Sequence, residues 1–329
     1  MRNRQVYAEQ RRKRQSGERA GPSGHRELRV VLFLALLLPL AGACGTDPAG
    51  ETARIRGDRA FARGDYDEAL AEYRLSLLRE DPGTAGAVRA AHAYVALGRV
   101  DEARALYDEA VAQDSVHADQ AVSDLVALAR RAHQSRDNYG MASAMEAALH
   151  FRPGLAVEEL ALPMARHYSN SGEYGRARPL YLRALGENRA DPDIILETAL
   201  AHEEIGDCES ALIFLEEFRE LAPRREDEVR WHVGSCSFQM ALEVAEEGSV
   251  DEALQHLDAV LELQEPRTLL AQAYFEKGEI LVKLGDCAAA LNAYRAVTDA
   301  DASGSGSLVR RALDRVDEIR FSDGEGTPC

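Results

Sequence analysis

The sequence is poor in aromatic residues and rich in small ones, which restricts the class of fold. Phe, Tyr and Trp make up 6% of the residues, and Trp231 is the one tryptophan. Alanine is frequent, and small side chains suit the close packing of helices better than the interior of a β-sandwich or barrel. No stretch alternates polar and apolar residues with a period of two over a useful length. The sequence therefore indicates an all-α protein.

Cationic residues are too few to favour a nucleic-acid partner. The net charge is −17, and the first 43 residues carry nine Arg or Lys against three Asp or Glu, so the chain from Cys44 onward carries −23. Proteins that bind nucleic acid need cationic side chains to displace the counterions of the phosphates. The same acidity disfavours electrostatic docking on an anionic membrane face. We therefore expect no nucleic-acid partner.

Motifs for catalysis, cofactor binding and metal binding are absent as well. The nine His residues are scattered, with no H-E-x-x-H, no two His four residues apart and no Cys/His cluster. No phosphate loop or G-x-G-x-x-G follows a strand, and Ser303–Ser307 is a linker rather than a nucleophile elbow. We therefore predict no catalytic residues, no metal site and no cofactor, so that the protein is not an enzyme.

One long apolar run is present, near the N-terminus. Val30–Ala41 is almost uninterrupted and follows Arg26 and Arg29. As a helix this run would extend about 18 Å, which is short of the roughly 30 Å of a bilayer's hydrocarbon core. Its length and its basic flank are typical of a secretory signal peptide.

The residues that follow, Leu-Ala-Gly-Ala-Cys ending at Cys44, resemble the lipobox of bacterial lipoproteins. The resemblance implies that residues 1–43 are a signal peptide, that Cys44 is acylated, and that residues 44–51 form the lipidated cysteine and its tether. Gly45 after the cysteine is typical of lipoproteins sorted to the outer membrane. The expected location is therefore the cell envelope, lipid-anchored at the outer membrane and facing the periplasm. The alternative is an ordinary signal-peptidase site with a chance cysteine.

A short phrase recurs along the rest of the chain. It has a Gly, a bulky residue two places later, an Ala three places further and often a Tyr four places beyond that. The interval is 34 residues between the first two copies. The recurring residues are Gly64, Tyr66, Ala69 and Tyr73; Gly98, Ala103 and Tyr107; Gly172, Tyr174, Ala177 and Tyr181; Gly206 and Ala211; Gly248 and Ala253; and Gly285, Ala290 and Tyr294.

This period and these positions resemble the tetratricopeptide repeat. The resemblance implies an all-α protein, an α-solenoid of about seven helix pairs over residues 52–300 that forms a superhelix. In each pair the Gly ends the first helix in a left-handed cap. The Ala lets the second helix approach the first, and the Tyr fills the gap against the next repeat. A degenerate copy at Arg136–Met141 supplies the remaining pair.

Several segments depart from the regular period. The interval between Gly206 and Gly248 is eight residues too long, so we expect the helix through Trp231–Glu247 to be about two turns longer. Pro163 predicts a late start or a kink in its first helix, whereas Pro179 should lie in the first turn or so of its second helix. After the repeats, residues 301–307 read as a flexible break, 308–321 as a capping helix and 322–329 as a disordered tail.

Four cysteines remain after Cys44. An oxidising compartment would permit disulfides, and Cys208, at the start of a second helix, could contact Cys236 on the next first helix. The alternative is that Cys208 and Cys287, which share a repeat position, are small buried hydrophobes. The paired C-x-x-C spacing that a zinc site needs is absent.

The family resemblance also implies a binding surface, the concave face lined by the first helices. Members that bind chaperone C-termini use a Lys/Asn clamp, and here Asp58, His92 and Arg166 stand where the clamp Asn would be, which disfavours that ligand. A solvated polar face is the alternative interpretation of the whole set. By repeat position the face would include Arg89, His92, Arg166, Asn170, Glu203 and Lys283.

The function that the resemblance implies is an envelope-anchored protein–protein interaction scaffold or adaptor that assists assembly of a cell-envelope complex. Its partners would be envelope proteins, and it would contact the membrane by the lipid anchor only. The alternative is a glycan- or solute-binding outer-membrane lipoprotein. Sugar-binding platforms favour exposed aromatic rings, and one Trp is poor support for them, so a small-molecule ligand is not expected.

Overall fold

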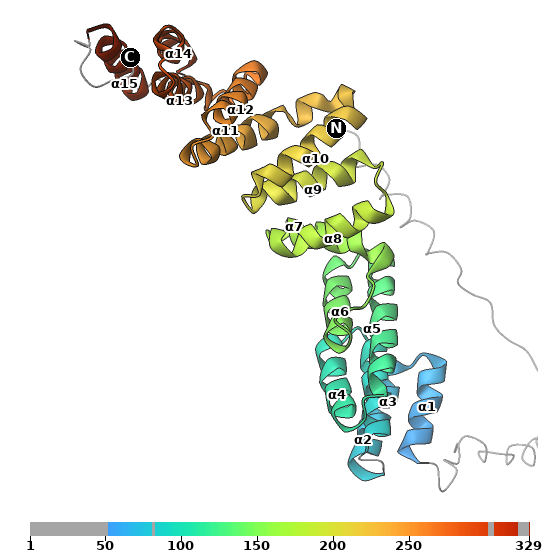
Figure 1. Cartoon of the computed structure of the whole chain (residues 1–329). Coiled ribbons are helices and arrows are strands. Elements are labelled where there is room, and N and C mark those ends of the chain that lie inside the picture. Colours follow the sequence, from blue (N-terminus) through green and yellow to red (C-terminus); the bar gives the residue numbers. More distant parts are fainter. Residues whose placement is uncertain (1–51, 81–82, 302–305, 322–328) are drawn as a thin grey trace, which may run out of the picture. The chain divides into compact units, whose positions relative to one another are not determined.

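A computed structural model describes residues 52–80, 83–301, 306–321 and 329 (Figure 1). The predicted signal peptide, Cys44 and its tether lie outside these residues. Every regular element in the described ranges is helical. The α-helices are α1 (Ala53–Arg63), α2 (Tyr66–Arg79), α3 (Thr84–Ala96), α4 (Val100–Gln113), α5 (His117–Gln134), α6 (Asn138–Phe151), α7 (Ala161–Asn170), α8 (Tyr174–Glu187), α9 (Pro192–Glu204), α10 (Cys208–Leu221), α11 (Arg230–Glu246), α12 (Val250–Leu263), α13 (Leu270–Lys283), α14 (Cys287–Ala300) and α15 (Ser307–Phe321), with the 3-10 helices η1 (Glu158–Leu160) and η2 (Pro223–Glu228).

The helices α1 to α14 form seven consecutive pairs, and each pair packs on the next. The fifteenth α-helix, α15, packs on α14 and α13 through Ala312 and Val316, which are buried. This arrangement confirms the predicted all-α solenoid of helix pairs. In the part of the chain described, no helix is both long and apolar enough to cross a membrane.

Each pair turns at a residue in the left-handed region of φ, where glycine is at little disadvantage. The second helix then begins two residues later. Six of the seven turns have glycine at this position: Gly64, Gly98, Gly172, Gly206, Gly248 and Gly285, with φ between 74° and 90°. The degenerate copy places Arg136 there instead, at φ 63°.

We expect Arg136→Gly to raise the free energy of unfolding by about 1 kcal/mol, because a side chain with a Cβ is strained in the left-handed region. Urea denaturation of the two proteins measures the difference. Gly98→Ala, at the same turn of the second repeat, is the matched control and should lower stability by a similar amount. If Arg136→Gly is neutral or destabilising, contacts of the arginine outweigh the strain.

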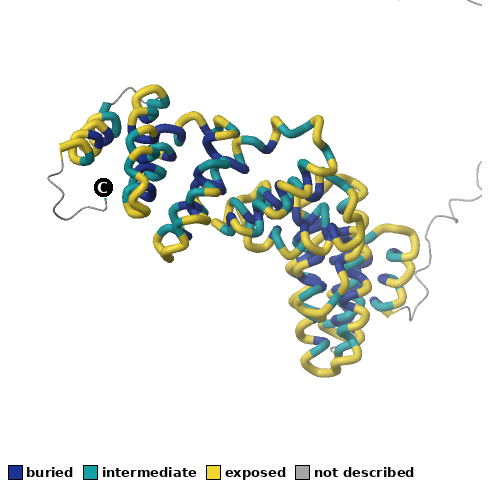
Figure 2. Tube along the Cα trace, turned by 45° about the horizontal axis from the view of Figure 1, so that its top comes forward, coloured by how far each residue is buried: buried dark blue, intermediate teal, exposed yellow. Residues whose placement is uncertain are grey.

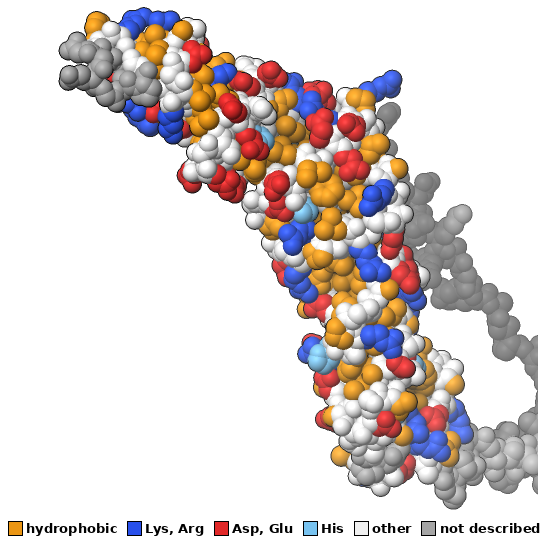
Figure 3. Space-filling model, viewed as in Figure 1, with side chains coloured by type: hydrophobic (Ala, Val, Ile, Leu, Met, Phe, Trp, Pro, Cys, Tyr) orange, Lys and Arg blue, Asp and Glu red, His pale blue; other side chains and the backbone are white. Residues whose placement is uncertain are grey.

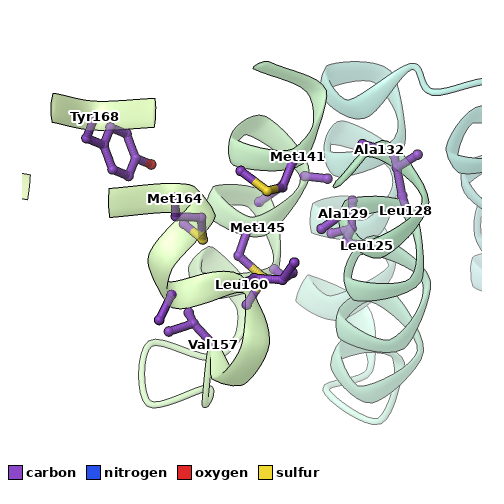
Figure 4. Close-up of a cluster of buried hydrophobic side chains, with 14 of the residues drawn as sticks. Leu125, Leu128, Ala129, Ala132, Met141, Met145, Val157, Leu160, Met164 and Tyr168 are labelled. Carbon is purple, nitrogen blue, oxygen red and sulfur yellow. The ribbon is translucent and has the colours of Figure 1, made fainter. Parts of the chain in front are cut away.

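The core lies between the two helices of each pair and between neighbouring pairs, as the buried stretches in Figure 2 show. The Ala of each clear repeat copy is fully buried where the second helix meets the first. The Tyr position is filled by a buried aromatic in four repeats, by Leu215 and Leu257 in two and by Met145 in the degenerate one. Met141 and Met145 of α6 face Leu125 and Leu160 in Figure 4, where flexible thioethers replace the small and aromatic side chains of the other repeats.

The extra length between Gly206 and Gly248 is divided between two places. Helix α11 has 17 residues against 13 in α3 and α9, and the six-residue η2 occupies the loop before it. Helix α11 is therefore about one turn longer than α3 and α9, so the expected extension of two turns was wrong. The loop instead forms a 3-10 helix that begins at Pro223, which cannot continue α10.

The predicted helix positions of Pro163 and Pro179 differ in how well they agree with the structure. Pro163 is the third residue of α7, which begins only at Ala161 after η1, so the predicted late start is confirmed. Pro179 is the sixth residue of α8, one turn further in than predicted. Its missing N–H leaves the carbonyl of Gly175 without a helical partner, and Gly175 is exposed, so that water can satisfy this oxygen.

Candidate functional site

Several charged side-chain pairs, which we call the cross-repeat ladder, join a first helix to the next first helix, to η1 or to the capping helix α15. Each rung places a carboxylate of one repeat against an Arg or His one repeat away, at 2.6 to 2.8 Å. Figure 3 shows one face of the molecule, on which acidic and basic side chains are interspersed. The rungs are His92–Asp124, Arg130–Glu159, Arg166–Glu197, His232–Glu203 and Arg315–Glu279.

The first rung is the most buried. The side chain of Asp124 is 8% exposed and accepts hydrogen bonds from Tyr107 and Gln120, and His92 Nδ1 lies 2.7 Å from its Oδ2. One carboxylate thus holds α3, α4 and α5 together. Burial acts to raise the pKa of Asp124, but the hydrogen bonds from His92, Tyr107 and Gln120 outweigh it, so the pKa lies below its ordinary value.

This lowered pKa predicts a pH dependence of stability. A carboxyl whose pKa is lower folded than unfolded stabilises the fold above its unfolded pKa of about 3.9, and the contribution disappears as pH falls through the folded pKa. Asp124→Asn should therefore narrow the gap in free energy of unfolding between pH 6 and pH 3 relative to the wild type. Urea denaturation at both pH values measures this gap. An unchanged gap would contradict the assignment.

The third rung is a bidentate ion pair. Arg166 donates from Nε and Nη2 to the two carboxylate oxygens of Glu197, at 2.8 Å each. The hydrogen bond to Glu197 raises the pKa of Arg166. Nearby, burial raises the pKa of Tyr181 to about 12. The guanidinium and the carboxylate orient each other, but about half of the Arg166 side chain remains open to solvent.

Three of the six residues expected on the binding face belong to the cross-repeat ladder. His92, Arg166 and Glu203 are rungs, so their charges already have partners in the next repeat. Arg89 is half-buried on α3, whereas Asn170 and Lys283 are exposed on α7 and α13. The partners Asp124, Glu197 and His232, and both residues of the other two rungs, were not predicted. Their signal was present as an opposite charge 29 to 36 residues away, close to one repeat.

All four cysteines after Cys44 form disulfides. Cys208 pairs with Cys236, as the positions of these residues on neighbouring helices suggested, and both are buried. Cys287 pairs with Cys329, which lies in the segment expected to be a disordered tail, so Cys329 is fixed to the start of α14. The sequence alone does not predict this pair, because the repeat pattern ends before Cys329.

The exposure of the two disulfides predicts the order of their reduction. Cys208 and Cys236 are 3% and 0% exposed, whereas Cys287 and Cys329 are partly accessible. Because exchange requires an attacking thiolate to reach a sulfur atom, we expect limiting dithiothreitol to open Cys287–Cys329 about tenfold faster. Timed alkylation and mass spectrometry of the peptides measure both rates. Equal rates would show that local opening, not exposure, controls access.

One further groove holds several titratable side chains. Among the residues described, no group of three or more His, Cys, Asp or Glu could hold a metal ion. A shallow groove of about 430 Å³ between α13 and α15 contains charges of both signs. Burial raises the pKa of Glu276 there, but Glu279 and Glu318 are ion-paired with Arg315. One arginine therefore pairs with two of the carboxylates that line the groove.

Comparison with known proteins agrees with the repeat pattern. Two family models, both described as tetratricopeptide repeat, match residues 60–129 and residues 162–226 and 238–305. A cellulose synthase operon protein C from Xanthomonas axonopodis pv. citri is 35% identical over 175 residues, which are 50% of this chain and 11% of that protein. The chain thus spans about a tenth of that relative.

Solved structures are similar at low identity. A Naa15/Naa10 complex bound to HypK-THB matches with 19% identity and a TM-score of 0.42, over 80% of this chain and 38% of that one. The MamA protein matches with 16% identity and a TM-score of 0.31, over 53% and 92%. The two family models together match more than half of the chain, and the structure consists of the helix pairs that this repeat forms. The chain therefore belongs to the tetratricopeptide-repeat family.

Proposed function

We propose that the protein is an envelope-anchored scaffold that holds a protein partner along the face formed by its first helices. The observation that carries the proposal is a column of half-buried aliphatic side chains, one on each of α3, α5, α7 and α9. Partly exposed apolar side chains beside charged pairs are suited to contact with another protein. The column consists of Val88, Val126, Leu162 and Leu196.

The cellular location is part of the proposal. It is supported by the apolar run and the Cys44 motif, and by the pairing of the other four cysteines in disulfides. Disulfides persist in oxidising compartments such as the bacterial periplasm. Three acyl chains on Cys44, as in the lipoproteins it resembles, would make the attachment effectively permanent, since stable anchoring takes more than one chain.

The test is photocrosslinking in cells. A photoreactive residue at the exposed Asn170 of α7 should trap one envelope protein, and one at the exposed Glu217 of α10 should not. Cys44→Ala should lose the adduct if the anchor brings the partners together. Equal adducts from both positions, or none from either, would count against a partner on this face.

The match to a cellulose synthase operon protein favours a second candidate, a glycan-binding lipoprotein. Isothermal titration of the mature chain with cell-wall, capsular and cellulose oligosaccharides separates the two. Saturable heat at submillimolar concentration, together with no adduct at Asn170, would favour glycan binding.

A further inference from the structure

An apolar groove lies at the N-terminal end of the repeats, between the second helices α2 and α4. Its volume is about 330 Å³, and the ring of Tyr94 from α3 contributes to its lining. Leu77 and Leu106 line it on either side, and Leu78 is 83% exposed at its edge. Leu78 is the most exposed of the large apolar side chains described.

The chain enters the fold at the end of α2 that lines this groove. The carboxylate of Glu80, directly after α2, accepts hydrogen bonds from the backbone N–H of Ala53 at 2.9 Å and of Arg54 at 3.4 Å. These bonds fix the first turn of α1 against the last turn of α2. Thr52 therefore lies at the same end of α2 as Leu78, which is two residues before Glu80.

Charges around the groove are arranged unevenly. Glu102 is neutralised by an ion pair with Arg99, whose guanidinium lies 4.8 Å from the centre of the Tyr94 ring. Arg74 and Arg79 are exposed on α2, and neither forms an ion pair with a described residue. An exposed leucine with an arginine on either side is suited to the interface of a bilayer, where the apolar side chain inserts and the cations meet lipid phosphates.

We propose that this groove docks on the bilayer surface that carries the chain's own lipid anchor, with Leu78 inserted among the headgroups. The inference rests on the proposed acylation of Cys44. Seven residues, 45–51, lie between Cys44 and Thr52, so eight chain steps of about 3.5 Å let the anchor lie no more than about 28 Å from the first helix. A tether this short keeps the groove at high effective concentration at the membrane. The chain from Cys44 onward carries a charge of −23, so electrostatic repulsion keeps the rest of its surface away from an anionic bilayer. The contact is thereby confined to this end of the protein.

The test uses the chain from Cys44 onward, with the Cys44 thiol coupled to a maleimide lipid while both disulfides remain closed. The vesicles contain phosphatidylethanolamine and phosphatidylglycerol with brominated acyl chains. In a Trp231→Phe background, Leu78→Trp provides a single fluorophore, and Ile213→Trp, exposed on α10, is the matched control. We expect Trp fluorescence from position 78 to shift to shorter wavelength and to fall by about half through bromine quenching, which acts only near the acyl chains.

The control at position 213 should show neither effect, and adding Arg74→Glu with Arg79→Glu should restore most of the fluorescence at position 78. Equal, unquenched emission at both positions would overturn the docking. A blue shift at position 78 that needs no vesicles and grows with protein concentration would also overturn it, in favour of a second copy. Mass spectrometry of the native protein tests acylation separately, because the coupled chain supplies its own anchor.

Discussion

Asp124→Ala is expected to lower the free energy of unfolding by about 3 kcal/mol or more. Tyr107 is 0% exposed, and the structure gives its hydroxyl a hydrogen bond to Asp124, so the substitution leaves this hydroxyl buried without that acceptor. Removing one partner of a buried polar pair costs the desolvation of the other, and bonds from His92 and Gln120 are lost as well. Urea denaturation monitored by circular dichroism measures the loss.

Two further variants make this prediction sharp. Asp108→Ala removes the carboxylate of the exposed His150–Asp108 pair and should cost less than about 1 kcal/mol. Adding Tyr107→Phe to Asp124→Ala removes the orphaned hydroxyl and should recover part of the loss. If Asp124→Ala costs no more than Asp108→Ala, Asp124 does not hold the two repeats together.

Gly234→Ala should cost about 3 kcal/mol, because α11 passes directly against the loop after α12. A Cβ at position 234 would lie 1.9 Å from the carbonyl oxygen of Glu265 and 3.0 Å from Pro266 Cδ. The nearest obstacle is backbone, which cannot rotate away as a side chain can, so the helix and the loop must separate. Thermal and urea denaturation measure the effect.

Gly186→Ala is the control for this substitution. Gly186 is exposed in α8, and a Cβ there would meet nothing within 4 Å, so alanine should be neutral or stabilise the protein by up to about 1 kcal/mol. Similar losses at both positions would show that the close approach of α11 to the loop is not what the glycine serves.

The sequence was sufficient for the fold because each repeat is specified locally. A left-handed Gly, a buried Ala and a large apolar residue recur at fixed spacing, and each acts on its own helix pair or the next. The degenerate copy was recognised even though Arg136 replaces the Gly. The eight extra residues before Gly248 could be counted but not placed, because a longer helix and a 3-10 turn fill the same length.

The face of the first helices was less predictable. His92, Arg166 and Glu203 were selected by repeat position as exposed side chains, and the structure pairs each with a charge in the next repeat. Such pairing depends on side-chain direction between helices about 30 residues apart, which a single-repeat pattern does not encode. The close approach at Gly234 could not be predicted for the same reason, since it depends on a loop 31 residues away.

The buried Cys208–Cys236 bond has a mechanical consequence. A force that pulls the two ends of a repeat protein apart places its backbone under tension. The two cysteines are 28 residues apart, so a pulling force crosses from one sulfur to the other and bypasses α10 and η2. Without the bond, unravelling this segment would add up to about 95 Å of slack. With it, the chain between Cys208 and Cys236 cannot lengthen, so a pulled chain can extend only by unfolding other segments.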